Sequence, residues 1–305
     1  MARLLSSANA ARPSLSELLA SGEMVLAPGC YDALGARLIE EAGFPAAYMT
    51  GFGTSAARLG RPDVGLLTLT EMTDNARRIA QAVEIPVIAD ADTGYGNPIN
   101  VIRTIREYEA AGVCAVHIED QAMPKKCGHM EGKALITADE MVAKVQAAVA
   151  ARRSPDFLII ARTDARAVEG LDAAIDRGRR YREAGADVLF IEAPQSVAEI
   201  ETVATAFDGV PLLFNYAEGG KTPAVSHEHL RRLGFKLVIF PISTLLVATA
   251  AIRSALHRIK QDGSPIELLP SMLPFNDFLE FIGMAEIREL ESRYAAGADQ
   301  PSTPS

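Results

Sequence analysis

The chain has 305 residues, of which 49% are hydrophobic and 23% are charged. That length and composition are ordinary for a globular protein with one large core. The net charge of −9 argues against nucleic acid or an anionic membrane as the main partner, because both repel an acidic protein. A small anionic ligand would need local positive charge or a bound cation in its pocket.

Cysteine usage and the apolar stretches bear on where the protein works. Cys30, Cys114 and Cys127 form an odd, sparse set that gives no disulfide framework, so we expect a reducing compartment, the cytoplasm. The segment Met1–Ser21 has no apolar run of the signal-peptide kind. The apolar stretch Leu237–Ile252 is broken by a proline and is too short to span a bilayer. We therefore expect no membrane association.

Eight short apolar runs along the chain have the composition of β-strands. Amphipathic segments with helical spacing separate them, such as the one whose apolar face carries Leu34, Leu38 and Ile39. Glycines such as Gly43 and Gly112 follow several of these segments, as expected where a helix stops. The strand-like runs are Met24–Ala27, Ala46–Thr50, Pro86–Asp90, Ala115–Glu119, Phe157–Arg162, Val188–Glu192, Pro211–Asn215 and Leu237–Pro241.

Alternation of fully apolar strands with helices predicts an α/β fold with a parallel sheet that is buried on both faces. Eight strands close a (β/α)8 barrel of the TIM type, although an open doubly wound sheet also remains possible. We expect one domain over residues 1–305, with about 242–296 as a C-terminal helical segment and 297–305 as a disordered tail. The helical segment would pack either outside the barrel or against a neighbouring subunit.

Residues capable of chemistry follow one predicted strand after another. In a barrel the carboxyl ends of the strands converge on one face, where active sites are built. Ordinary solubility would instead scatter such residues over the helix exteriors. The strand-end groups are Thr50–Gly53, Asp90–Gly94, His117–Asp120, Arg162–Asp164, Glu192 and Asn215.

Three of these strand-end residues form a set of acids. Asp90 and Asp92 share one face of an extended strand end, and Glu119 follows the next strand. Ligands that are all oxygen suit a hard cation such as Mg²⁺. The alternative is that Asp92 and Glu119 cap helices or pair with Arg162. A carboxylate cluster without a cation would be costly, which favours the metal.

A basic, glycine-containing loop, Pro124–Lys133, follows the fourth strand. It carries Cys127 between lysines and a histidine, and we expect these charges to lower the pKa of the Cys127 thiol. Such a thiol is a usable acid, base or nucleophile. The alternative is a buried small hydrophobe, which is how we interpret Cys30 and Cys114. A charged loop is a poor place for an inert core thiol, so we prefer a functional role for Cys127.

The run Lys125–His129 resembles the K-[KR]-C-G-H signature of the isocitrate lyase family, within the isocitrate lyase / phosphoenolpyruvate mutase superfamily. The resemblance extends from about Ala27 to Pro241, which is most of the chain. Matches in this order are highly specific for the superfamily and far less specific for one reaction within it. Besides the signature they comprise Gly29–Ala33, Met49–Gly51, Pro62–Gly65, Asp90–Gly96, Ile118–Gln121, Ile160–Asp164 and Glu218–Pro223.

The resemblance implies a (β/α)8 barrel whose last helix swaps between paired subunits, usually within a tetramer, so we expect a homo-oligomer that is a dimer of dimers. It also implies Mg²⁺ as the cofactor, with Mn²⁺ as a possible substitute. Asp90 would bind the metal directly, Asp92 and Glu119 would hold metal-bound waters, and Asp63 would reach that water network.

The resemblance further assigns residues to the substrate. Thr50, Gly51 and Phe52 match the segment that grips an α-keto acid or enolate, and the family often has serine in place of Thr50. Cys127 matches the residue that protonates the nascent enolate carbon. The full set of candidate catalytic residues is Cys127, Lys125, His129, Arg162 and Glu192, and the candidate substrate-binding residues are Thr50, Gly51, Phe52, Gly128 and Asn215.

What these assignments imply is a magnesium-dependent carbon–carbon lyase. It would cleave a 2-hydroxy dicarboxylate of the substituted-malate or methylisocitrate type to an α-keto acid and a second carboxylate through an enolate. The segments His129–Lys133 and Glu218–Lys221 look more like the branch of dimethylmalate lyase and carboxyphosphonoenolpyruvate mutase than like methylisocitrate lyase. The alternatives are a phosphonomutase, an oxaloacetate hydrolase or decarboxylase, and a non-catalytic ligand-binding barrel.

Overall fold

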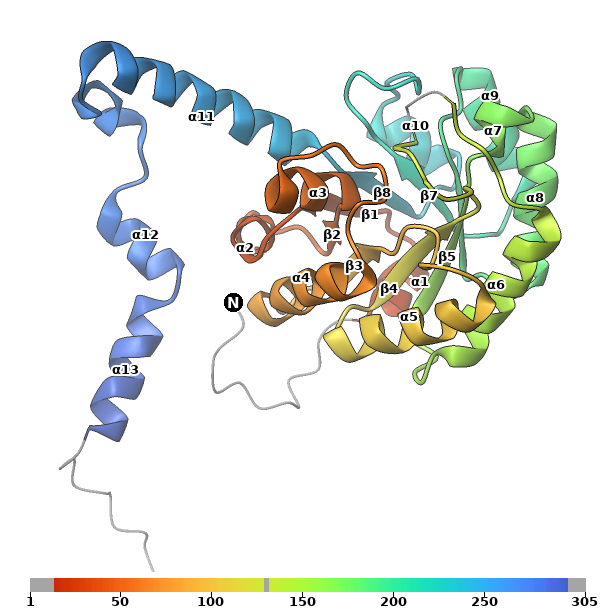
Figure 1. The fold of residues 1–305 in the computed structure, drawn as a ribbon, viewed down its shortest axis with the longest axis horizontal. Helices are drawn as coiled ribbons and strands as arrows, with labels where there is room; N and C mark the ends of the chain where they lie inside the picture. The colour runs from red at the N-terminus through yellow and green to blue at the C-terminus, as the bar shows by residue number, and fades with distance from the viewer. Residues whose placement is uncertain (1–13, 129–131, 296–305) are drawn as a thin grey trace, which may run out of the picture. The chain divides into compact units, whose positions relative to one another are not determined.

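Eight parallel strands close into a barrel in chain order in the computed structural model, which describes residues 14–128 and 132–295 (Figure 1). Val25 of the first strand pairs with Leu237 of the eighth, so the expected barrel is confirmed and the open sheet is excluded. Each strand overlaps an apolar run expected from the sequence, and the ends differ by at most three residues. The strands are β1 (Val25–Cys30), β2 (Ala47–Met49), β3 (Val87–Asp90), β4 (Ala115–Glu119), β5 (Leu158–Thr163), β6 (Val188–Ile191), β7 (Leu212–Asn215) and β8 (Leu237–Phe240).

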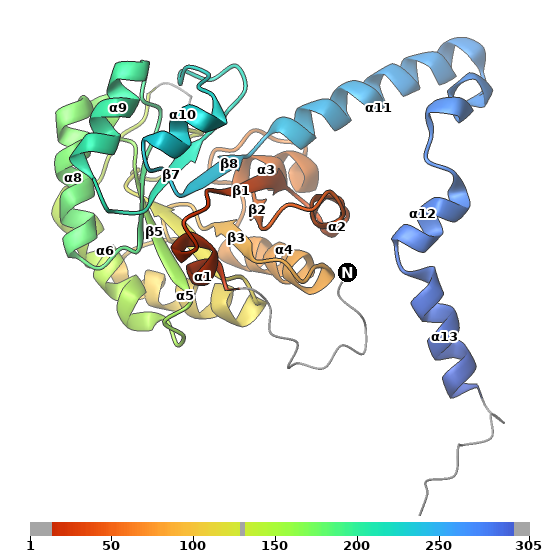
Figure 2. The same cartoon turned by 180° about the vertical axis from the view of Figure 1, so that it is seen from behind.

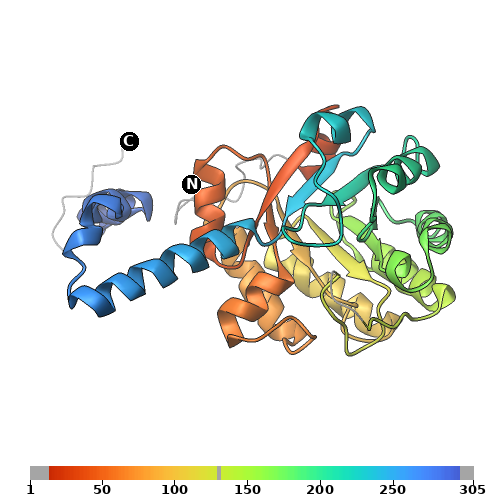
Figure 3. The same ribbon diagram turned by 90° about the horizontal axis from the view of Figure 1, so that it is seen from above.

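Helices follow the strands and surround the barrel (Figure 3). Local sequence explains their ends. Thr68 forms a capping box with Glu71 at the start of α4, and Asn97 caps α5 ahead of Pro98. Gly112 ends α5 in the left-handed conformation, as expected. The helices of the barrel are α1 (Leu15–Ala20), α2 (Ala33–Glu41), α3 (Gly51–Leu59), α4 (Leu69–Ala82), α5 (Pro98–Ala111), α6 (Ala138–Ala151), α7 (Ala165–Val168), α8 (Leu171–Glu183), α9 (Val197–Ala206) and α10 (His227–Arg232).

Apolar side chains fill the barrel and decide which of its ends is open. Ile88, Ile160 and Leu213 belong to a buried cluster inside the barrel. Leu15 and Leu19 of α1 belong to the same cluster, so α1 covers the amino-terminal end of the barrel (Figure 2). A separate cluster packs the strands against the surrounding helices. The carboxyl ends of the strands are therefore the end that is available for a site.

The contacts divide the chain into the barrel unit, which runs to Val247, and a second unit that starts at Ala248. The C-terminal helices are α11 (Ser243–Asp262), α12 (Phe275–Phe281) and α13 (Met284–Tyr294), with a 3-10 turn at Ile266–Ser271. The segment expected to be helical at about 242–296 thus contains these three helices and the 3-10 turn. None of the residues in these elements is buried. A helix swap between subunits stays a prediction, and the tail expected at 297–305 lies outside the described residues.

Across residues 14–128 and 132–295, none of the helices combines the length and the apolar character that crossing a bilayer requires.

Candidate active site

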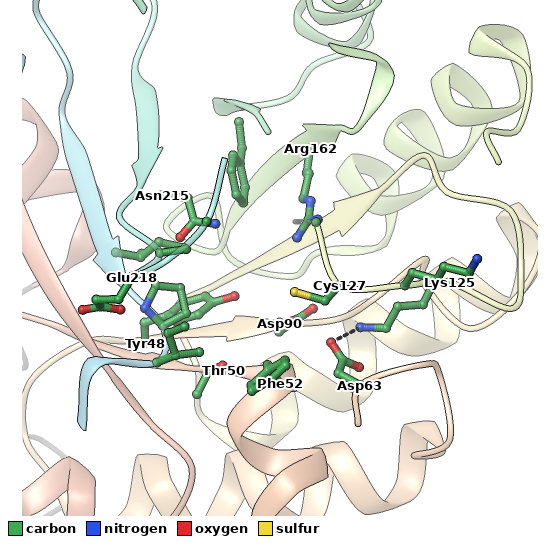
Figure 4. A pocket seen from close by; sticks show the side chains of 18 of the residues that line it. Tyr48, Thr50, Phe52, Asp63, Asp90, Lys125, Cys127, Arg162, Asn215 and Glu218 are labelled. Atoms are coloured by element: carbon green, nitrogen blue, oxygen red, sulfur yellow. Dashed lines mark hydrogen bonds and ion pairs between the residues drawn. The ribbon is translucent and has the colours of Figure 1, made fainter. Parts of the chain in front are cut away.

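A pocket of about 690 Å³, open mouth included, lies at the carboxyl ends of the strands (Figure 4). It collects most of the residues that the sequence nominated, although they come from loops far apart in the chain. Nominated residues in its lining are Thr50, Phe52, Asp63, Asp90, Lys125, Cys127, Gly128, Arg162 and Asn215. Apolar side chains complete the wall, among them Phe190, Ile239, Pro241 and Ile242. The strand ends and the loops after them thus bring these residues around one pocket, and their roles stay predictions.

Thr50, Gly51 and Phe52 lie where β2 meets α3. Thr50 is the N-cap of α3, and its Oγ1 accepts a hydrogen bond from the Gly53 amide at 3.2 Å. The Gly51 amide donates to Oδ2 of Asp90 at 3.2 Å. The amino-terminal end of a helix favours negative charge, so this end of α3 is suited to an anionic ligand as well as to Asp90.

Asp90 sits at the end of β3 and is held from several sides. Its Oδ1 accepts a hydrogen bond from the Asp92 amide at 2.9 Å, and its backbone carbonyl accepts one from the Tyr108 hydroxyl at 2.8 Å. Asp92 follows with a φ of 48°, a left-handed conformation that costs energy and persists only where its surroundings enforce it. The turn after β3 is therefore built to aim the Asp90 carboxylate at the pocket.

The other acids of the expected metal set are paired with cations of the chain. Nζ of Lys125 lies 2.6 Å from Oδ2 of Asp63 and 2.5 Å from Oδ1 of Asp92. Nη1 of Arg162 lies 3.1 Å from Oε2 of Glu119, so the pairing considered as an alternative from the sequence is present. Within residues 14–128 and 132–295, no three His, Cys, Asp or Glu side chains are arranged so that they could hold a metal ion. Two of the four acids, Asp63 and Asp92, meet at the same ammonium group, that of Lys125.

The chemistry of these donors nevertheless fits a divalent cation. Oε1 of Glu119 is buried and has no hydrogen-bond partner among the described residues. Burial raises the pKa of Glu119 well above its usual range and raises the pKa of Asp92 to about 6, although Lys125 opposes the shift at Asp92. Buried carboxylates in this condition are stabilised by more positive charge. Oxygen ligands alone suit Mg²⁺ or Mn²⁺ better than a softer metal.

Arg162, at the end of β5, presents a fixed positive charge to the pocket. Its Nε and Nη2 donate to the two carboxylate oxygens of Asp164 at 2.9 and 3.1 Å. Its guanidinium carbon lies 5.1 Å from the centre of the Phe190 ring. Burial disfavours the charge, but Asp164, Glu119 and Glu192 hold the pKa of Arg162 well above its usual range. The guanidinium is therefore always charged and oriented for a carboxylate.

Glu192 lies behind the pocket rather than in its lining. Its side chain is fully buried, with Oε2 3.9 Å from Nε of Arg162. Nδ2 of Asn215 contacts both of its carboxylate oxygens, at 3.3 and 3.2 Å. Asn215 itself does line the pocket. The structure thus places Glu192 to hold Arg162 and Asn215, while Asn215 is the one placed to meet a ligand.

The loop after β4 brings a thiol into the pocket. Figure 4 shows Sγ of Cys127 turned toward the middle of the pocket, between Arg162 and Asp90. The Gln121 side chain fixes the preceding residue, donating to the Lys126 carbonyl at 2.8 Å and accepting from the Lys126 amide at 2.9 Å. The ammonium of Lys125 contacts Asp63 and Asp92, so the expected influence of this lysine on the Cys127 thiol stays a prediction. His129 lies outside the described residues.

One further site residue, Tyr48, was not predicted, and it contacts His117, which belongs to the strand-end groups named from the sequence. Tyr48 lines the pocket, and its hydroxyl lies 2.7 Å from Nε2 of His117. Both are buried, and burial raises the pKa of Tyr48 and lowers that of His117 to about 4. At neutral pH both are uncharged. Tyr48 stands two residues before Thr50 in a strand, so it shares a face with Thr50, and this spacing is the signal that could have found it.

The phosphoenolpyruvate phosphomutase family model matches residues 15–260 of this chain. The chain belongs to this family.

Two similar proteins are named as lyases, and the chain studied is compared with each of them in turn. It is 48% identical to 2,3-dimethylmalate lyase of Eubacterium barkeri, over 93% of this chain and 98% of the relative. It is 43% identical to 2-methylisocitrate lyase of Aeropyrum pernix, over 94% of this chain and 92% of the relative. The family resemblance and the kinship to lyases expected from the sequence are therefore confirmed.

Solved structures of the family have the same fold. A crystal structure of 2,3-dimethylmalate lyase superposes with a TM-score of 0.87 and 40% identity, over 95% of this chain and 96% of that one. Phosphonopyruvate hydrolase, solved in complex with oxalate and Mg²⁺, superposes with a TM-score of 0.85 and 33% identity, over 92% of this chain and 98% of that one. A divalent metal thus occurs in a family member that shares this barrel.

Proposed function

We propose that this chain is a divalent-metal-dependent carbon–carbon lyase that cleaves a 2-hydroxy dicarboxylate of the substituted-malate type. The products would be an α-keto acid and a second carboxylate. The observation that carries the proposal is that one pocket receives the Cys127 thiol, the Arg162 guanidinium and the Asp90 carboxylate together. A binding module has no need of a proton-donating thiol beside a carboxylate-binding arginine.

The metal would be held by Asp90 directly, and by Asp92, Glu119 and Asp63 through bound waters. When bound, Mg²⁺ or Mn²⁺ supplies Lewis-acid stabilisation of negative charge on the substrate oxygens. The buried Oε1 of Glu119 and the all-oxygen donor set support this assignment.

The side chains have separate roles in the proposed cleavage. The amino-terminal turn of α3, with Gly51 and Phe52, holds the keto-acid end of the substrate, and Arg162 holds a carboxylate with its oriented guanidinium. Tyr48, kept neutral by burial, donates a hydrogen bond to a substrate oxygen. Asn215, held by Glu192, orients the fragment that departs.

The cleavage is a retro-aldol reaction. A carboxylate of the pocket or a water molecule takes the proton of the substrate hydroxyl, the hydroxyl oxygen becomes the keto oxygen, and the electron pair of the broken C–C bond passes to the departing carboxylate fragment as an enolate. Cys127 then gives its thiol proton to the enolate carbon. A wall of Phe190, Ile239, Pro241 and Ile242 suits an alkyl substituent on that carbon.

A second part of the proposal concerns assembly. Apolar side chains such as Ile252, Leu256 and Ile259 in α11 are exposed on the chain by itself. Exposed apolar residues in such number mark a protein interface. We propose that a second copy of the chain covers them, in a homo-oligomer that is a dimer of dimers. The cytoplasmic setting stays a prediction.

The reaction is tested by incubating the protein and Mg²⁺ with a series of 2-hydroxy diacids, oxaloacetate and phosphonopyruvate-type compounds. Keto-acid release is followed with a coupled dehydrogenase, and the second product is identified by NMR. We expect keto acid from an alkyl-substituted malate. The Cys127→Ser variant should bind the same diacid in calorimetry without turning it over. Rearrangement of a phosphonate with no keto acid from any diacid would instead make the chain a phosphonomutase, and release of oxalate from oxaloacetate alone would make it a hydrolase.

A further inference from the structure

Lys133 is a buried lysine at the end of the loop that carries Cys127. Its side chain is only 2% exposed, and the Asp164 side chain that it contacts is fully buried. Solvating a loop, the ordinary role of a lysine in such a segment, is therefore not what Lys133 does. A buried ammonium is tolerated only where anionic and polar groups pair with it, so its partners define its role.

Those partners are two groups of the active site. Nζ of Lys133 lies 2.8 Å from Oδ1 of Asp164, the same carboxylate that binds Arg162 with both oxygens. It also donates a hydrogen bond to the carbonyl of Gly128, the residue directly after Cys127. One ammonium thus joins the backbone beside the thiol to the carboxylate that orients the substrate-binding guanidinium.

Both ends of this connection are anchored. The backbone near Lys133 pairs with the segment after β4, with the Ala122 amide donating to the Ala134 carbonyl at 2.8 Å. Asp164 is held by Asp120, whose Oδ1 accepts from the Asp164 amide at 2.9 Å. Asp120 is in turn bound by Thr163, Tyr181 and Arg177 at 2.7, 2.8 and 3.3 Å. Lys133 therefore spans two fixed points, which is what a positioning group requires.

The packing at Gly128 shows how little freedom this arrangement leaves. A Cβ atom on Gly128 would meet Nη2 of Arg162 and Oε1 of Glu192, each at 2.5 Å. The loop backbone is thus drawn against the Arg162–Glu192 pair at the place where Lys133 binds its carbonyl. A shift of the loop by one ångström would move Cys127 relative to Arg162.

We propose that Lys133 is a positioning residue for the reaction. By binding both the Gly128 carbonyl and the Asp164 carboxylate, it fixes the position of the Cys127 thiol relative to Arg162. The expected effect on kcat rests on the proposed function. The link that Lys133 forms between Gly128 and Asp164 can be tested without any measurement of turnover. Arg162 keeps its two bonds to Asp164 when Lys133 is absent, so carboxylate binding should survive while proton delivery suffers.

The test compares the wild type with Lys133→Met, which keeps the length and apolar stem of the side chain but removes the charge. We expect kcat on the diacid substrate to fall about 100-fold, as for a misplaced catalytic group, while KM and the calorimetric Kd change by less than about threefold. Alkylation of Cys127 by iodoacetamide, followed by peptide mass spectrometry, should become faster because the loop has lost its tether. Lys133→Arg should recover part of both effects, since a guanidinium can also donate to two acceptors.

Lys236→Met is the charge-matched control, because Lys236 lies at the amino-terminal end of β8, away from the pocket. It should leave kcat and the alkylation rate unchanged. A wild-type alkylation rate and kcat in Lys133→Met would overturn the proposal. So would a loss of kcat that only parallels a drop in folded fraction, since Lys133 would then stabilise the fold without positioning Cys127. If the wild type turns over no diacid, the proposed function fails but the alkylation rates still decide whether the link exists.

Discussion

The backbone of Gly128 is packed so closely against Arg162 that a Cβ atom on the glycine would lie 2.5 Å from Nη2 of the guanidinium. Contacts this short are not tolerated, so an added methyl group must displace either the arginine or the loop. We therefore expect Gly128→Ala to raise KM for the diacid by about tenfold or more and to lower kcat as well.

The measurement for Gly128→Ala is steady-state kinetics beside a thermal melt. Gly43→Ala is the control, because Gly43 has a φ of 82° and no neighbour within 4 Å of the added Cβ. It should lose some stability through backbone strain and keep its kinetics. Unchanged KM and kcat in Gly128→Ala would show that the loop stands away from Arg162 in solution.

Arg162 binds Asp164 through two nitrogens while its third faces Glu119. A lysine cannot reproduce this planar arrangement, so Arg162→Lys should lower kcat/KM by about 100-fold or more even though the charge is retained. Arg78→Lys, at an exposed pair with Asp74, is the control and should behave as the wild type. Near-normal kcat/KM in Arg162→Lys would mean that only charge matters at this position.

The three cysteines should differ sharply in reactivity. Burial raises the pKa of Cys114 to about 12 and raises that of Cys30 further. The thiolate is the reactive form, so at pH 7.5, well below these values, both thiols stay protonated and inert. Cys127 lines the pocket, and we expect iodoacetamide to modify it first. Peptide mass spectrometry over a time course measures this, and modification of Cys114 at a comparable rate would contradict it.

Removal of divalent metal should abolish keto-acid release, and added Mg²⁺ or Mn²⁺ should restore it. The reason is that the lysine and arginine side chains of the pocket do not supply enough positive charge to balance its carboxylates and an anionic substrate. Asp90→Asn should weaken Mn²⁺ binding, measured by electron paramagnetic resonance, by about tenfold or more. Asp74→Asn removes a comparable carboxylate from the exposed surface and should leave Mn²⁺ affinity unchanged. Full activity after exhaustive chelation would exclude the metal from the reaction.

The exposed apolar residues of α11 predict an interface between copies. Ile252 and Leu256 are 59% and 61% exposed on the chain by itself. Leu256→Asp should shift the protein to a smaller assembly in light scattering, because burying a carboxylate in an apolar interface is costly. Lys260→Asp, a larger charge change on the same helix, is the comparison and should shift it less. An unchanged molar mass in Leu256→Asp would place the interface elsewhere.

Much of the architecture follows from local sequence. The strands appear where short apolar runs predicted them because a strand buried on both faces needs apolar side chains at every position. The site residues lie where polar side chains follow those runs, because parallel strands bring their carboxyl ends to one face. The family resemblance added the proposed roles of Cys127 and Asp90, which no periodicity could have assigned.

The pairings inside the site were not predictable in the same way. Lys125 stands 62 residues from Asp63 in the chain, yet their side chains are 2.6 Å apart. The Tyr48 hydroxyl of β2 contacts the His117 ring of β4, and no local sequence pattern predicts this contact. From the sequence, Lys133 would be expected at the surface, as a lysine of a charged loop. Only the folded structure shows that its side chain is buried and contacts Asp164 and Gly128.

Sequence alone therefore determined the barrel, the face that carries the pocket and most of the polar side chains that line it, since these depend on hydrophobic pattern and strand order. Tertiary structure decided which acid faces which cation, because those partners depend on strand register and on how loops from distant parts of the chain pack together. Burial then sets the charge of each group, and burial is a property of the folded neighbourhood rather than of any residue by itself.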